Sequence, residues 1–307
     1  MATVLITGGT GMVGSHLTEL LVTQGYEVII VSRSKLVKSK HTSISYALWD
    51  VAAQTIDREA IEKADYIIHL AGAGVADQRW SDKRKQEIVE SRTQSSQLLV
   101  KALSTIPNKV KAVVSASAIG WYGGDTVSSL KEGFREEDPA DYEFLGETCR
   151  LWEESIEPIT TLQKRLVKLR IGIVLSKDGG ALAEFKKPLR GGLAAILSKG
   201  KQMISWIHID DLCGMFVFAL ENNSVQGVYN AVAPEPVSNK TLTLTLARLM
   251  KGSFYIPIHI PSFVLKLMLG EMSIEVLKSA TVSNYKIETA GFKFNFPSIE
   301  VALDNLK

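Results

Sequence analysis

The chain has few of the features that mark special protein classes. Its 307 residues include only two cysteines, Cys149 and Cys213, which lie far apart and in no metal-like spacing. We therefore expect reduced thiols, no bound metal and a reducing compartment such as the cytoplasm. The sequence shows no internal repeat and no low-complexity segment.

An excess of one charge and a long apolar run are missing as well. Lys and Arg number 35 against 33 Asp and Glu, a net charge of +2, which favours neither a nucleic acid nor a membrane surface as partner. The longest apolar stretch near the end, 256–269, contains prolines, a histidine and a lysine and is too short to span a bilayer. Met1-Ala2 leads straight into an apolar strand, so we expect no signal or transit peptide. A small-molecule ligand remains the expected partner, with the chain a monomer or a homodimer.

The start of the chain carries the strongest positive signal. Residues 3–7 are a short β-branched run, and Gly8-Gly9-Thr10-Gly11-Met12-Val13-Gly14 follows, before leucines at helical spacing. Strand, glycine turn and helix is the arrangement that binds a pyrophosphate at a helix N-terminus. Gly8 permits the tight turn, Gly11 the close approach of a phosphate and Gly14 the packing of helix on sheet. A plain strand-to-helix turn is the alternative.

The end of the second expected strand, 27–31, bears on the choice of cofactor. A carboxylate there would bind a ribose 2′-hydroxyl and select NAD, but the sequence reads Ser32-Arg33-Ser34-Lys35. A guanidinium with nearby hydroxyls and an ammonium suits a 2′-phosphate. We therefore predict a preference for NADP(H) over NAD(H). The alternative is that Arg33 is a solvated loop residue and both cofactors are accepted.

Strand and helix patterns alternate up to about residue 175, which predicts an α/β fold: a Rossmann-type, doubly wound parallel sheet with helices on both faces. We assign 1–175 to a dinucleotide-binding domain, with sheet contributions from about 203–231, and 176–307 to a smaller, mostly helical substrate or lid region. The expected strands are 3–7, 27–31, 44–48, 65–70, 110–115, 166–174, 203–207 and 227–231. The expected helices are 83–103, 147–157, 212–220, 239–250 after an N-cap at Ser238, 262–270 and 273–280.

Several short motifs together resemble one family. They include the glycine segment 7–14, His69-Leu70-Ala71-Gly72, Ser115-Ala116-Ser117-Ala118 and Trp206-Ile207-His208-Ile209-Asp210-Asp211. The chain is similar to the extended and atypical short-chain dehydrogenases/reductases, in the NAD(P)-dependent epimerase/dehydratase group. Within that group it resembles the "epimerase family", also labelled cell-division-inhibitor-like, whose members carry a small C-terminal domain of unknown function. The resemblance covers essentially the whole chain.

The resemblance implies a set of cofactor contacts. Gly8, Thr10, Gly11, Met12 and Val13 would hold the pyrophosphate, and Arg33 would meet the 2′-phosphate. Asp50 would lie near the adenine, Leu70, Ala71 and Gly72 along the adenosine ribose, and Gly172 and Ile173 near the nicotinamide. Ser117 matches the hydroxyl that binds a substrate carbonyl or hydroxyl in the superfamily.

One part of the family pattern is missing. Superfamily enzymes use a Tyr-x-x-x-Lys pair, in which Lys lowers the pKa of the phenol that moves the proton. Counting back from Trp152-Glu153, these positions hold Leu145 and Cys149. Tyr122, in the loop after Ser117, is the alternative acid or base, and an aromatic wall is its structural alternative.

The remaining polar and aromatic candidates are assigned to the substrate. Arg92 would clamp an anionic group, Trp80 and Trp206 would line an apolar pocket, and His208 would contact the substrate; core packing or a solvated face is the alternative for each. The sequence thus predicts an NADP(H)-dependent oxidoreductase or epimerase-like enzyme acting on a small molecule. The alternative is a non-catalytic NADP(H)-binding sensor or partner-docking protein.

Overall fold

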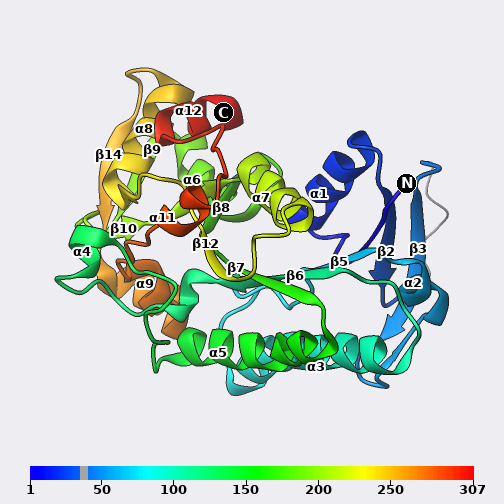
Figure 1. Cartoon of the computed structure of the whole chain (residues 1–307). Helices are drawn as coiled ribbons and strands as arrows, with labels where there is room; N and C mark the ends of the chain where they lie inside the picture. Colours follow the sequence, from blue (N-terminus) through cyan, green and yellow to red (C-terminus); the bar gives the residue numbers. More distant parts are fainter. Residues whose placement is uncertain (35–40) are drawn as a thin grey trace.

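The computed structural model describes residues 1–34 and 41–307, and an eight-stranded sheet forms its centre (Figure 1). The strand order is β12-β7-β6-β5-β1-β2-β3-β4, and all neighbours are parallel except β3 and β4. The bounds are β1 Thr3–Thr7, β2 Glu27–Ser32, β3 Ile44–Asp50, β4 Thr55–Ile56, β5 Tyr66–His69, β6 Ala112–Ala118, β7 Arg165–Ile171 and β12 Gly227–Ala231. The strand order reverses between β1 and β5, where ligands bind in such sheets. The predicted doubly wound parallel sheet is confirmed.

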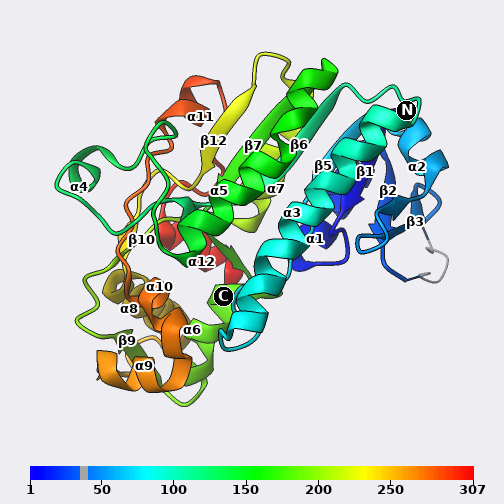
Figure 2. The same cartoon turned by 90° about the horizontal axis from the view of Figure 1, so that it is seen from below.

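Helices cover both faces of this sheet. Helices α1 (Met12–Thr23) and α7 (Ile209–Glu221) lie on one face. On the other face lie α2 (Arg58–Lys63), the 24-residue α3 (Asp82–Thr105), α5 (Phe144–Ile156) and the 3-10 helix η2 (Glu157–Leu162). Figure 2 shows α3 and α5 side by side beneath the strands. Both faces of the central strands are therefore buried, which agrees with the near-continuous apolar runs of β1 and β2.

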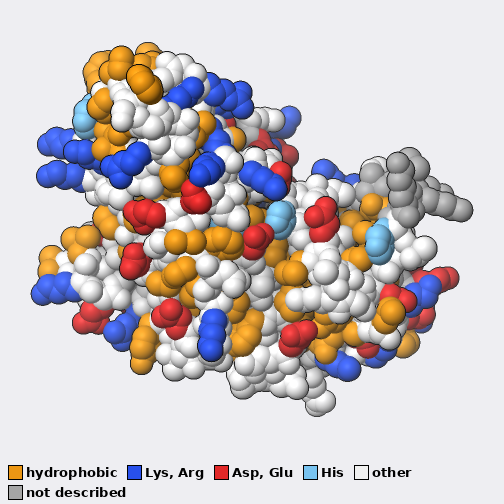
Figure 3. Space-filling model, turned by 90° about the horizontal axis from the view of Figure 1, so that it is seen from above, with side chains coloured by type: hydrophobic (Ala, Val, Ile, Leu, Met, Phe, Trp, Pro, Cys, Tyr) orange, Lys and Arg blue, Asp and Glu red, His pale blue; other side chains and the backbone are white. Residues whose placement is uncertain are grey.

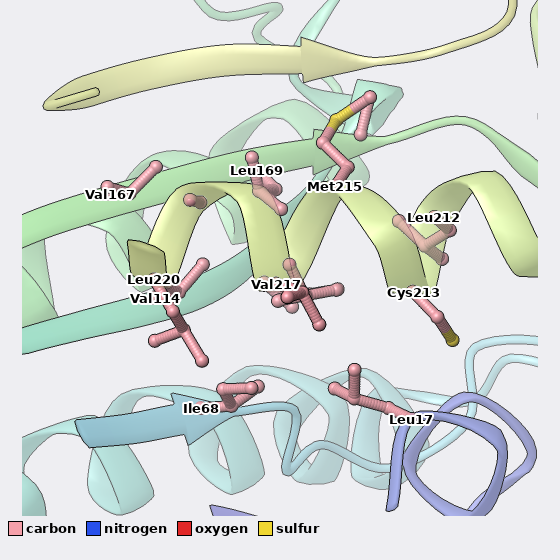
Figure 4. Close-up of a cluster of buried hydrophobic side chains, with 14 of the residues drawn as sticks. Leu17, Ile68, Val114, Val167, Leu169, Leu212, Cys213, Met215, Val217 and Leu220 are labelled. Carbon is pink, nitrogen blue, oxygen red and sulfur yellow. The ribbon is translucent and has the colours of Figure 1, made fainter. Parts of the chain in front are cut away.

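Helix α7 supplies most of the core on its face. In Figure 4, Leu212, Met215 and Val217 point from this helix toward the strands, among side chains of β5, β6, β7 and α1. Nine of its thirteen residues are buried. A segment from the second half of the sequence thereby completes the core of the first half.

The later part of the chain adds a second core at the carboxyl ends of the strands. Its elements are α6 (Gly180–Arg190), β9 (Leu193–Leu197), β10 (Met203–Ile204), β13 (Val237–Ser238), α8 (Asn239–Lys251), β14 (Ile256–Ile260), α9 (Ser262–Leu269) and α12 (Ile299–Leu306). Three two-stranded sheets join β9 to β14, β10 to β13, and β8 (Ile173–Ser176) to β11 (Trp206–His208). The short elements are η1 (Ile119–Trp121), α4 (Ser129–Glu132), η3 (Gly270–Met272), α10 (Ser273–Leu277) and α11 (Tyr285–Thr289).

Two predicted strands are each divided in the structure. The strand expected at 166–174 breaks at Gly172, where an added Cβ would lie 2.7 Å from the carbonyl oxygen of Ser205. The strand expected at 203–207 separates into β10 and β11, which pair with different partners outside the main sheet. Only β12 of the later strands joins that sheet, next to β7.

Some elements were not predicted, and one helix is shorter than expected. The sequence patterns did not predict α6, β9, β14, α11 and α12, and the helix expected at 273–280 ends at Leu277. Strand β14 contains Pro257 and pairs on one side only, a position in which proline costs no ladder hydrogen bond. Among the described residues, no helix is long and apolar enough to cross a membrane.

Candidate functional site

Two glycines of the first turn are required by the fold itself. Gly8 has φ +72°, and a Cβ there would lie 2.9 Å from the carbonyl carbon of Leu70. A Cβ on Gly14 would overlap the carbonyl oxygen of Gly8 and approach the Cα of Gly9 to 2.6 Å. Helix α1 therefore lies directly against the turn, and β1 lies directly against the segment after β5.

Gly11 has a different environment. It is the exposed N-cap of α1 at φ −77°, and within 4 Å an added Cβ would meet only the Gly8 carbonyl oxygen, at 3.4 Å. No side chain caps the helix, and the first N–H groups of a helix have no partner inside it. The amides of Met12 and Val13 therefore have no partner within the helix, and the neighbouring Thr10 is exposed. This cradle fits a phosphate group of a dinucleotide.

A buried hydrogen-bond network fixes the adjoining strand end. The Thr7 hydroxyl oxygen accepts from the amides of Leu70 at 3.2 Å and Ala71 at 3.3 Å, and lies 2.7 Å from Nδ1 of His69. Burial, with a smaller effect of Arg92, lowers the pKa of His69 to about 3. The neutral imidazole therefore helps to hold the two strand ends of the switch point together.

The residues expected at the adenosine end follow the neighbouring strands. Arg33 is exposed one residue beyond β2, and Asp50 is exposed at the end of β3, where it accepts a hydrogen bond from the amide of Ala53. Both lie at the sheet edge that carries the glycine turn. Within the described part of the chain Arg33 makes no ion pair. Lys35, the other expected cation, lies outside the described residues.

At the other end of this edge, Gly172 and Ile173 follow β7. The Gly172 amide donates to the carbonyl of Ala231, and the Ile173 amide donates to that of Ser205. The Ile173 side chain stays 40% exposed. An apolar side chain is therefore available where the resemblance places the nicotinamide.

Ser117 and Tyr122, the two catalytic candidates, share a buried polar network. Ser117 donates to Oε1 of Glu153 at 2.7 Å, and Arg170 donates to both Glu153 oxygens at 2.8 and 3.1 Å. Arg170 also donates to the Tyr122 hydroxyl, which donates to Asn230 at 2.7 Å. Tyr122 is fully buried, and its burial raises the pKa of the phenol despite the opposing effect of Arg170. The Tyr122 hydroxyl is therefore committed to protein groups.

The Glu153–Arg170 pair at the centre of this network was not predicted from the sequence. Both side chains are almost fully buried. The strand 165–171 carries three cations among apolar residues, and this is the available signal, because a buried charge needs a partner. The Arg170 guanidinium also lies over the Trp121 ring, 3.6 Å from its centroid.

Leu145 and Cys149, at the missing Tyr and Lys positions, pack against η1. A Cβ on Gly120 would lie 3.3 Å from the Cβ of Leu145 and 3.6 Å from the sulfur of Cys149. Burial raises the pKa of the Cys149 thiol to about 12. At neutral pH the Leu145 side chain has no titratable group and the Cys149 thiol stays protonated, so neither can act as a general base.

Arg92 and Trp80 both lie near the carboxyl edge. Arg92 donates to the carbonyls of Ala73 and Ile88 at 3.0 and 2.9 Å, and its guanidinium lies 5.0 Å from the Trp152 ring centroid. It is half-buried and pairs with no carboxylate of the described residues. Trp80 is also half-buried, and its indole donates to the carbonyl of Val75.

Trp206 and His208 are used for packing. Trp206 is fully buried in the second core and donates to the carbonyl of Glu235. His208 caps α7 by accepting from the amide of Asp210, and its ring stacks on Phe296 with centroids 3.7 Å apart. The geometry supports the packing alternative for both residues.

The expected lid segment reaches across to α3. Glu271, in η3, pairs with Lys85 at 2.5 Å, and Gly270 lies against the side chain of Arg79. The segment after α9 thereby contacts the start of the helix that follows β5. Among the described residues, no cluster of His, Cys, Asp or Glu could hold a metal ion.

Two known protein families match parts of this chain. Residues 4–144 match the NAD dependent epimerase/dehydratase family, and residues 260–306 match a domain of unknown function, DUF1731. An epimerase family protein of Staphylococcus saprophyticus is 36% identical over 304 residues, which cover 98% of each chain.

Two solved structures are similar over nearly all of this chain. The human epimerase family protein SDR39U1, crystallised with NADPH, has a TM-score of 0.84 at 29% identity and covers 99% of this chain and 98% of its own. A nucleoside-diphosphate sugar epimerase from Corynebacterium glutamicum has a TM-score of 0.77 at 30% identity, and the match covers 99% of this chain but 58% of that one.

Proposed function

Because the chain belongs to the epimerase family, within the NAD dependent epimerase/dehydratases, we propose that it is an NADP(H)-dependent oxidoreductase or epimerase-like enzyme that acts on a small polar molecule. The observation that carries this proposal is the open cradle at Gly11, at the point where the strand order reverses. The N–H groups at this uncapped helix N-terminus are the kind of donor that binds a phosphate.

The cofactor contacts follow the carboxyl edge of the sheet. Met12 and Val13 would hold the pyrophosphate through their amides, and Arg33 would bind a 2′-phosphate with its exposed guanidinium. Asp50, Leu70, Ala71 and Gly72 would contact the adenosine portion, and Gly172 and Ile173 the nicotinamide ring. The NADPH bound to human SDR39U1 supports the choice of NADP(H).

The bound cofactor would supply or accept a hydride, and the chain would orient the reacting carbonyl or alcohol. Ser117 is the better candidate for this contact, because its donation to Glu153 leaves lone pairs on Oγ that can accept from a substrate hydroxyl. Tyr122 fits a positioning role, since its hydroxyl already donates to Asn230 and accepts from Arg170. The C. glutamicum relative supports a nucleotide sugar as one substrate class to screen.

A second function has one specific observation in its favour. Leu145 and Cys149 fill the positions of the usual proton-transfer pair with an alkyl side chain and a buried thiol that stays protonated at neutral pH. A protein that binds NADP(H) and reports redox state to a partner needs no such pair. The absence of turnover with any carbonyl or alcohol substrate, alongside tight cofactor binding, would favour this alternative.

Replacement of Gly11 by Ala tests the cradle. The backbone angle of Gly11 suits alanine and the added Cβ meets only one atom, so the fold is expected to persist. The methyl group would occupy the space proposed for a phosphate, and we expect NADPH affinity measured by fluorescence titration to fall at least about tenfold, or about 1.4 kcal/mol.

Gly124→Ala is the matched control, because a Cβ there meets nothing within 4 Å and lies outside the proposed cofactor contacts. It should leave NADPH affinity unchanged. Equal affinity of the Gly11→Ala variant and the parent chain, with both folded by circular dichroism, would contradict the proposed phosphate site.

A further inference from the structure

Positive charge is concentrated in one part of the molecule. We define the basic lobe as residues 180–205 and 236–270, which contain α6, β9, β10, β13, α8, β14 and α9. These two segments hold nine Lys or Arg residues and one acidic residue, Glu184, a net charge of +8. Since the whole chain carries +2, the remainder carries −6. The small net charge of the whole chain is therefore the sum of a basic lobe and an acidic remainder.

The same lobe exposes large apolar side chains. Phe254 is 88% exposed and Ile256 64%, at the start of β14; Phe263, Leu267 and Met268, on α9, are 71%, 76% and 68% exposed. In Figure 3 the lobe projects at the upper left, where hydrophobic and basic side chains gather, whereas acidic side chains are more evident over the rest of that face. Exposed apolar side chains at both ends of β14, on a lobe of net positive charge, indicate an interaction surface.

Basic groups border this apolar surface at both ends. At the β14 end, the Phe254 amide donates to the carbonyl of Lys251, and the Lys251 ammonium reaches the carbonyl of Arg190. At the α9 end, a pocket of about 360 Å³ is lined by Lys199 and Lys201 together with the hydroxyl-bearing side chains of three serines, Ser198, Ser262 and Ser279. Lys266 projects from α9 itself. No described carboxylate pairs with Lys199, Lys201 or Lys266.

The chemistry of this surface favours a lipid bilayer over other partners. Seven of the nine cations are lysines, whereas protein interfaces are depleted of lysine and enriched in arginine, tyrosine and tryptophan. A second copy of the lobe would bring +8 against +8, and nucleic acid would not bury the aliphatic side chains of α9. Exposed Phe, Leu and Met beside lysines are typical of segments that lie in the interface of an anionic membrane.

We propose that the basic lobe binds the surface of anionic membranes, with α9 and the start of β14 entering the headgroup region. The lysine and serine pocket beside α9 would receive a lipid phosphate. This peripheral contact requires no membrane-spanning helix. The expectation from sequence that membranes are not partners rested on total charge, which does not describe this lobe.

Sedimentation of the full-length protein with lipid vesicles tests the proposal. We expect it to sediment with vesicles of phosphatidylcholine containing about 30% phosphatidylserine, but not with phosphatidylcholine alone, and to dissociate as salt is raised and screens the surface charge. The double variant F263S/L267S should weaken binding at least about tenfold, and so should K199E/K201E.

Two substitutions outside the lobe serve as controls. Tyr142→Ser removes a fully exposed aromatic side chain, and Lys131→Glu reverses an exposed lysine; neither should alter sedimentation. No binding to anionic vesicles, or equal binding by the lobe variants, would overturn the proposal. A dimer in solution that F263S/L267S disrupts, without vesicle binding, would overturn it in favour of contact between copies. The assay contains no cofactor, so its outcome is independent of the proposed enzyme function.

Discussion

Single residues at the switch point show what local sequence can and cannot predict. The glycine spacing identifies Gly8 and Gly14, where the fold leaves no room for a side chain, and Gly11, where the proposed phosphate would need that room. His69 was recognised as part of a motif, but its contact with Thr7 was not, since the two residues lie 62 positions apart in the sequence. The Tyr122–Asn230 bond spans 108 positions and escaped prediction for the same reason.

The buried His69 should make stability depend on pH. Its pKa is about 3 in the folded chain against an ordinary 6.5, so the unfolded chain binds a proton first as pH falls. The stability that the neutral imidazole contributes is full above pH 6.5 and is lost progressively toward pH 3, at about 1.4 kcal/mol per pH unit. Urea unfolding between pH 7 and 4 should therefore show the gap between the parent chain and His69→Asn narrowing on acidification.

The exposed His259 provides the comparison. His259→Gln should leave the slope of stability against pH as it is in the parent chain. A gap between the parent and His69→Asn that stays constant from pH 7 to pH 4 would show that His69 accepts a proton without cost in the folded state.

At the scale of elements, the sequence predicts the central strands and most long helices better than the elements that are bordered by glycines. Strands β1 and β2 can be predicted because burial on both faces favours near-continuous runs of Val, Ile and Leu. Helix α6 was not predicted because the glycine pairs at its two ends, Gly179-Gly180 and Gly191-Gly192, are typical of loops. In the structure these glycines border the helix, and Gly180 and Gly192 have φ +64° and +80°.

The predicted N-cap at Ser238 is confirmed and can be measured. Its hydroxyl oxygen accepts from the amide of Thr241 at 3.0 Å, at the start of α8. Ser238→Ala should lower the free energy of unfolding by about 1 kcal/mol. Ser298 occupies the same position before α12 but makes no capping hydrogen bond through its side chain.

Ser298→Ala is therefore a control that matches both the residue type and its place in a helix. It should change stability by much less than Ser238→Ala in the same urea titration. Equal losses for the two variants would mean that the hydroxyl of Ser238 does not stabilise α8 through its capping bond.

At the scale of the molecule, the two halves of the sequence share one architecture. Helix α7 and strand β12 come from the later half yet complete the core and the sheet of the earlier half. The periodicity of the sequence predicts α7 and β12 as elements. It does not predict that they pack on the earlier half of the chain, because those contacts join positions far apart in the sequence. The charge distribution is likewise a property of the folded chain: the basic lobe is assembled from two segments that 30 residues separate.

The proposed cofactor site also belongs to the whole molecule, since its residues come from the ends of five strands: β1, β2, β3, β5 and β7. In the proposed site the glycine turn would bind the dinucleotide, and the exposed Arg33, with the hydroxyls of Ser32 and Ser34, would favour NADP(H) over NAD(H). Arg58, exposed on α2 and paired with Glu62, is a matched arginine away from this edge.

The most direct measurement is therefore a fluorescence titration of the parent chain, Arg33→Ala and Arg58→Ala with NADPH and, in parallel, NADH. The parent chain should bind NADPH more tightly than NADH, and Arg33→Ala should weaken NADPH binding by about 1.5–3 kcal/mol with little effect on NADH. Arg58→Ala should match the parent chain. Equal weakening of both cofactors by Arg33→Ala would contradict the specificity for NADP(H), and no binding of either by the parent chain would contradict the proposed function itself.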